Sequence, residues 1–118
     1  MKKSEYLEVG ININDLVPAV AVHPGELLRE ALKKRGFTQK YFAELTNILP
    51  SQLNEVINKK RGINAEMALK IGPALNMDAI IWARAQMIYE FDLARIKQKN
   101  EKQSQNKKRK LSKALKKV

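Results

Sequence analysis

The sequence of 118 residues contains no cysteine and a single histidine, His23. Without thiols the chain cannot build a disulfide scaffold or a thiolate zinc finger, and an intracellular setting is weakly favoured. One histidine without a second imidazole or thiolate ligand does not make a metal site. We therefore expect no metal and no cofactor, and we interpret His23 as a turn residue.

Long apolar runs and the motifs of common catalytic sites are also missing. The longest apolar run is AVAV at residues 19–22, whereas a membrane-spanning helix needs about 20 apolar residues. Nothing resembles a signal peptide, so we expect a cytoplasmic protein. We find no serine, histidine and carboxylate arrangement, no glycine-rich phosphate loop and no paired carboxylates in a recognisable motif. These absences argue against an enzyme.

The excess of positive charge is concentrated near one end of the sequence. The net charge is +11, but residues 97–118 hold ten Lys or Arg against Glu101, which leaves +2 for residues 1–96. The charge is therefore a property of this tail, and it does not show that a folded domain binds nucleic acid. The tail has no aromatic side chain for a membrane interface. It also has few apolar residues to offset its ordering entropy, which predicts disorder.

Residues 38–63, TQKYFAELTNILPSQLNEVINKKRGI, have the pattern of two short helices joined by a tight turn. Thr38 is a good N-cap for the first helix, and Asn47 tolerates the left-handed backbone that a tight exit needs. Pro50 suits the first position of a second helix that runs to Asn58. This spacing predicts a helix-turn-helix, whose second helix lies in the DNA major groove. A small helical bundle without a DNA site is the alternative.

The side chains of the second helix and of the loop after it favour the DNA-binding interpretation. One face of the second helix is apolar, through Leu53, Val56 and Ile57, and the rest carries amide and hydroxyl groups. A basic loop, Lys59-Lys60-Arg61-Gly62, follows. Cations and exposed amides at such positions can hold DNA phosphates.

Three segments give the chain a family resemblance: HPGELLREALKKRGFTQKYFAEL, then LNEVINKKRGINAEMALKIGPAL, then an aspartate and a tryptophan before a long helix. Over residues 23–95 they resemble the HigA antitoxin branch of the phage-repressor-like (XRE/Cro) helix-turn-helix family. The resemblance implies a homodimer on double-stranded operator DNA that represses its own operon. It also implies that the protein binds and neutralises a HigB or RelE-like toxin, which cleaves messenger RNA on the ribosome. A free-standing XRE-type regulator without a toxin is the alternative.

Four positions match the base-reading sites of that family, and two of them depart from its chemistry. Leu49 and Pro50 have no side-chain hydrogen bond to offer, Ser51 can donate or accept, and Glu55 can only accept. Apolar contact with thymine methyl groups is then part of the expected recognition. The predicted DNA-binding residues are Gln39, Leu49, Pro50, Ser51, Gln52, Asn54, Glu55, Lys59, Lys60 and Arg61.

The predicted fold is all-α, a five-helix phage-repressor-like domain with a long final helix. The domain spans residues 23–99, between an extended arm over residues 1–22 and a basic, disordered tail over residues 100–118. The long helix, from Ala79 to Lys99, is apolar on several sides and must bury more than one face. Additional core is one explanation, and we favour a dimer interface formed by Ile80, Trp82, Ile88, Tyr89 and Phe91.

The arm has an alternating apolar pattern that is typical of an extended segment. It could fold onto its own domain, onto a dimer partner or onto another protein. Because strand addition suits such a pattern, we assign toxin binding to Tyr6, Val9, Ile11 and Ile13, with the body of the domain as the alternative.

Overall fold

The computed structural model describes residues 17–116, with side chains described as far as Ser112. Within these residues it contains five helices and no strand. They are α2 (Pro24–Arg35), α3 (Gln39–Thr46), α4 (Pro50–Ile57), α5 (Ala65–Ala74) and α6 (Ala79–Lys116). The all-α, five-helix prediction is confirmed. The toxin-binding residues predicted in the arm lie outside the described residues.

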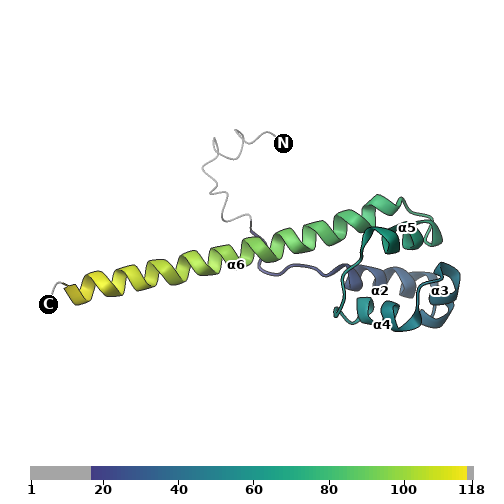
Figure 1. Cartoon of the computed structure of the whole chain (residues 1–118), viewed down its shortest axis with the longest axis horizontal. Coiled ribbons are helices and arrows are strands. Elements are labelled where there is room, and N and C mark those ends of the chain that lie inside the picture. The colour runs from purple at the N-terminus through teal and green to yellow at the C-terminus, as the bar shows by residue number, and fades with distance from the viewer. Residues whose placement is uncertain (1–16, 117–118) are drawn as a thin grey trace. The chain divides into compact units, whose positions relative to one another are not determined.

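The chain forms two compact units, one from Val22 to Glu90 and one that combines the terminal segments. In the first unit, α2 to α5 gather into a bundle, with α3 and α4 side by side (Figure 1). The first turns of α6 add Trp82 to the same core. The largest fully buried side chains of this core are Phe42, Leu28, Leu53, Ile71, Leu75 and Val56.

Local chemistry fixes the ends of these helices. The Thr38 hydroxyl accepts from the Tyr41 N–H at 3.0 Å, and the Asn64 side chain accepts from the Met67 N–H at 2.8 Å. Such caps satisfy backbone donors that have no partner inside the helix. At the other end of α2, Gly36 adopts a left-handed φ of 68°. The bundle therefore has the helix boundaries that its capping residues predict.

Helix α6 corrects the prediction of a disordered tail. It continues through Lys116 rather than ending near Lys99 (Figure 1). Residues 97–110 contain only Lys, Arg, Gln, Glu, Asn and Ser, with no glycine or proline to end a helix. Lys, Arg, Gln and Glu are good helix formers, so the helix can extend on propensity where the lack of apolar side chains suggested disorder. No helix among the described residues is long and apolar enough to cross a membrane.

Candidate nucleic-acid interface

The turn between α3 and α4 is held by one left-handed residue and one buried side chain. Asn47 has a φ of 56°, which asparagine adopts more readily than most residues. Ile48, which follows it, is 4% exposed and belongs to the core. The Ile48 N–H also donates to the Ala43 carbonyl at 3.2 Å. These contacts fix the angle at which α4 leaves the turn.

Helix α4 presents one face to the core and another to solvent. Leu53, Val56 and Ile57 are buried. Leu49 at the N-cap is 62% exposed. Of the residues predicted to bind DNA, Pro50, Ser51 and Asn54 are exposed, and Gln52 and Glu55 are half-buried. The fold therefore brings the predicted base-reading residues of α4 to one exposed surface.

A hydrogen bond joins the two helices of this surface. The Asn54 amide on α4 donates to the Gln39 side-chain oxygen at the start of α3, at 3.2 Å. The Asn58 amide in turn donates to the Asn54 side-chain oxygen at 2.9 Å. Both Gln39 and Asn54 are exposed, so their remaining donors and acceptors face solvent. The contact orients two predicted DNA-binding amides with respect to each other.

The basic loop after α4 does not present its three cations equally. The Lys59 Nζ lies 2.5 Å from a carboxylate oxygen of Glu26 on α2, and Lys59 has a left-handed φ of 64°. The Arg61 Nε donates to the Glu55 carboxylate at 2.8 Å. Lys60 is exposed and forms no ion pair within the described part of the chain. Lys59 thus braces the loop against α2 in this structure, and its contact with a DNA phosphate stays a prediction.

Two residues that the sequence did not single out shape the same surface. Gln86 on α6 accepts from the Ile63 N–H at 2.8 Å and donates to Glu90 at 3.0 Å, which anchors the end of the basic loop. Lys70 on α5 lines a hollow beside α4, together with Gln52 and Arg61. Neither role has a local sequence signal, because Gln86 binds Ile63 and Lys70 lies near Gln52, each more than 15 positions away.

His23 is the N-cap of α2 and packs against Tyr89 of α6. Its Nδ1 accepts from the Gly25 N–H at 2.9 Å. Its ring packs edge-on against the Tyr89 ring, with the two ring centroids 4.7 Å apart. Burial lowers the pKa of His23 below 6.5; the Glu26 carboxylate opposes this shift, and Lys59 adds to it. His23 is thus a buried cap at the start of α2.

This pKa shift makes the stability of the domain depend on pH. A lowered pKa means that the unfolded chain binds the His23 proton more readily, so stability is complete above pH 6.5 and falls below it. We expect urea unfolding to give a lower free energy at pH 5.5 than at pH 7.5. His23→Asn keeps an acceptor for the Gly25 N–H without a titrating ring, and should flatten this dependence. Equal pH dependence in the two proteins would contradict the assignment.

The residues predicted for a dimer interface differ in how much of their side chains is exposed. Ile80, Ile88 and Phe91 are 47%, 54% and 61% exposed. Trp82 is only 3% exposed and packs in the core. The prediction for Trp82 is wrong, because its large ring fills space inside the domain rather than on its surface. Tyr89 is half-buried and contacts His23.

The fold and the exposed surface together define a helix-turn-helix DNA-binding protein. Residues 28–79 match the sequence model of a helix-turn-helix family, HTH_3. The chain belongs to this XRE-type helix-turn-helix family, whose members are DNA-binding proteins and not enzymes.

The proteins that this chain resembles include a virulence-associated protein, an antitoxin and a putative antidote protein. Virulence-associated protein I of Dichelobacter nodosus is 37% identical over 75 residues, which cover 63% of this chain and 69% of that protein. The structure of antitoxin HigA of Pseudomonas aeruginosa with the higBA promoter is 30% identical, with a TM-score of 0.61, and covers 73% of this chain and 92% of that one. A putative antidote protein of a plasmid maintenance system from Nostoc punctiforme is 27% identical, with a TM-score of 0.67, and covers 73% and 94%.

Proposed function

We propose that this protein is an antitoxin that represses its own operon as a homodimer on operator DNA and neutralises a HigB or RelE-like toxin in the cytoplasm. The observation that carries the DNA-binding part is the exposed polar face of α4 beside Lys60 and Arg61. The structure of antitoxin HigA of Pseudomonas aeruginosa with the higBA promoter supports this proposal, since that protein has a similar fold at 30% identity.

The proposed base contacts come from the first turns of α4. Ser51 can donate or accept, Gln52 and Asn54 can do both at once, and Glu55 can accept from the cytosine amino group. Leu49, at 62% exposure, is suited to a thymine methyl group rather than to a hydrogen bond. Lys60 and Arg61 hold phosphates that flank these bases. Recognition in this proposal combines few hydrogen bonds with apolar contact.

The phosphate contacts are tested with the double variant Lys60→Ala, Arg61→Ala. Phosphate contacts carry no sequence information, so affinity should fall by a similar factor for operator and for scrambled DNA. The slope of log K against log salt should become shallower by about 1 to 2, because each contacted phosphate contributes about 0.9. Titration of labelled duplexes at several salt concentrations measures both quantities.

A matched control removes two cations away from the interface. Lys33 and Lys34 lie in the last turn of α2, so Lys33→Ala, Lys34→Ala changes the net charge equally. We expect this control to keep most of the salt slope. A salt slope that is unchanged in the Lys60 and Arg61 variant, or equally reduced in the control, would argue against a phosphate site in the basic loop.

Toxin binding is assigned to the arm before residue 23. The face that carries Ser51 and Lys60 must stay available for DNA if the protein represses while it holds a toxin, so the toxin needs another surface. The tail is unsuitable, because an RNA-cleaving toxin is expected to be basic and would be repelled by the cationic segment after Ile96. The alternating residues Val9, Ile11 and Ile13 suit strand addition to the toxin.

Deletion of residues 1–22 separates the two activities. We expect the truncated protein to lose most of its toxin affinity and to keep its operator affinity, measured by calorimetry with purified toxin and by DNA titration. Equal toxin binding by the truncated and full chains would exclude the arm and favour the body of the domain. A neighbouring reading frame for a basic protein of RelE-like size supports an antitoxin, and its absence favours the free-standing regulator.

A further inference from the structure

The part of α6 after Ile96 differs chemically from the rest of the described chain. Between Lys97 and Lys110 there is no apolar residue, and the segment has seven Lys or Arg against Glu101 alone. All of these residues are exposed except Lys99, which is half-buried. This segment, residues 97–110, is called the cationic helix below.

The cationic helix has little to stabilise it within its own chain. A helix that is polar on every side needs many ion pairs along its surface or a partner. None of its cations pairs with a carboxylate among the described side chains. Lys99 and Lys102, and Lys107 and Lys110, are instead like charges three residues apart, which repel each other. A polyanion would remove this repulsion.

Cationic and amide side chains form a stripe along one side of α6, which begins at Arg95 and continues through the cationic helix. Arg95, Lys99, Lys102, Asn106 and Arg109 recur every three or four residues, which places them along one side of α6. At a rise of 1.5 Å per residue this stripe extends about 21 Å. A DNA duplex presents one negative charge per 1.7 Å of its axis, so about a dozen phosphates fall within that length.

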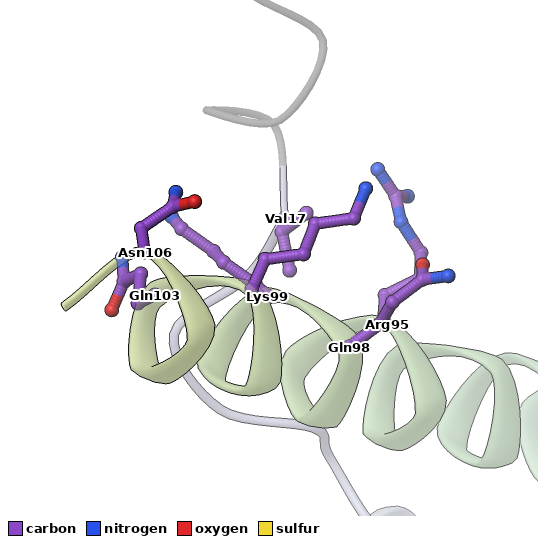
Figure 2. A pocket seen from close by; sticks show the side chains of 7 residues that line it. Val17, Arg95, Gln98, Lys99, Gln103 and Asn106 are labelled. Atoms are coloured by element: carbon purple, nitrogen blue, oxygen red, sulfur yellow. The ribbon is translucent and has the colours of Figure 1, made fainter. Parts of the chain in front are cut away.

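Four of the five residues of this stripe, all except Arg109, line a hollow. Arg95, Gln98, Lys99, Lys102, Gln103 and Asn106 surround it together with Val17. Figure 2 shows the side chains of Arg95, Lys99 and Asn106 standing out from the same stretch of α6 beside Val17. Each of the six α6 side chains has N–H donors, and none is a carboxylate. Such a lining attracts an anionic oxygen and offers hydrogen bonds to it.

We infer that the cationic helix is a second, sequence-independent DNA-binding surface that holds the phosphate backbone of duplex DNA next to the operator. This inference rests on the proposed operator binding by α4 and adds to it. Because the helix belongs to the same chain as the helix-turn-helix, its phosphate contacts form within one complex and need no second encounter. Affinity for all duplexes rises, while the preference between sequences stays with α4.

The test neutralises the helix and leaves the helix-turn-helix unchanged. The variant carries Lys102→Gln, Lys107→Gln, Lys108→Gln, Arg109→Gln and Lys110→Gln in the full-length chain. The control carries Lys→Arg at positions 102, 107, 108 and 110 and so keeps every charge. Both are titrated with the DNA upstream of the protein's own reading frame and with a scrambled duplex of equal length, at several salt concentrations.

We expect the neutralised variant to bind both duplexes about 10-fold or more weakly near 0.1 M salt, with a salt slope shallower by about 2 to 4. The ratio of the two affinities should not change, and the arginine control should match the wild type. Equal salt slopes in the neutralised variant and the wild type would overturn the inference. Unchanged duplex binding with lost binding to single-stranded RNA, or to vesicles of anionic lipid, would also overturn it and assign the helix to that partner.

Failure of the proposed operator function has a different signature. In that case the wild-type protein itself would bind the upstream and scrambled duplexes equally, whatever the neutralised variant does. Circular dichroism of the neutralised variant should show helix content equal to or above that of the wild type, because like-charge repulsion is reduced.

Discussion

Replacing Gly25 by alanine is expected to destabilise the domain by about 3 kcal/mol or more, although alanine normally favours a helix. A Cβ atom at Gly25 would lie 1.9 Å from the Val56 carbonyl oxygen, which is backbone and cannot rotate away. Helices α2 and α4 would have to separate, and α4 carries the proposed base contacts. We therefore expect operator affinity to fall together with stability, measured by urea unfolding and by DNA titration.

Gly36 at the other end of α2 provides a matched control. It has a left-handed φ of 68°, but a Cβ there would meet no atom within 4 Å. Gly36→Ala should therefore cost only the strain of that backbone conformation, about 1 kcal/mol. It should also leave the proposed contact surface of α4 in place. If Gly25→Ala were no more harmful than Gly36→Ala, the close approach of α2 to α4 would not be what requires glycine.

Glutamate at both Ile88 and Phe91 is expected to convert the proposed dimer to a monomer and to weaken operator binding by about 100-fold or more. These side chains are 54% and 61% exposed and lie three residues apart on α6, so together they form an apolar surface that a partner could cover. Two recognition helices must lie about 34 Å apart to enter successive major grooves, and a monomer has only one. Sedimentation velocity gives the mass, and a titration of operator DNA gives the affinity.

Leu69→Glu is the control for this experiment. Leu69 lies on α5 and is 67% exposed, so glutamate there removes a comparable apolar surface outside the proposed interface. We expect this variant to stay dimeric and to bind the operator as the wild type does. Circular dichroism should show native helix content in both proteins, because none of the three positions is buried. A dimer that survives both changes on α6 would place the interface elsewhere, for example in the arm.

Much of the helix-turn-helix could be predicted because its boundaries depend on neighbours in sequence. Thr38, Asn47 and Asn64 act through hydrogen bonds or backbone conformations within four residues of their own positions. The apolar spacing of Leu53 and Val56 likewise fixes which face of α4 is buried. Such local rules gave the two helices of the motif and the exposed side of the second one.

The residues that were missed or misassigned depend on distant contacts or on balances between weak effects. The position of Trp82 in the helical pattern is the same whether its side chain is exposed or buried. Only the packing of α6 against the bundle decides between the two. The ion pair between Lys59 and Glu26 was missed because the two residues are distant in sequence. The length of α6 depends on two opposing effects, the helix propensity of its residues and their lack of apolar contacts. The sequence analysis gave too much importance to the second effect and predicted a helix that is too short.

The ion pair between Glu55 and Arg61 has a consequence for how salt affects DNA binding. Arg61 and Glu55 lie 2.8 Å apart and together carry no net charge, so bringing this pair to DNA displaces fewer condensed counterions than bringing a free cation would. To meet a phosphate, Arg61 must exchange one anionic partner for another, and Glu55 is then left beside the bases. A cytosine or adenine that faces Glu55 can donate to its carboxylate from the amino group, whereas the acceptor atoms of a guanine or thymine there repel it. In the proposed complex, the pair thus makes part of the phosphate attraction depend on the base that faces Glu55, and the salt slope is smaller than the cations of the basic loop alone would give.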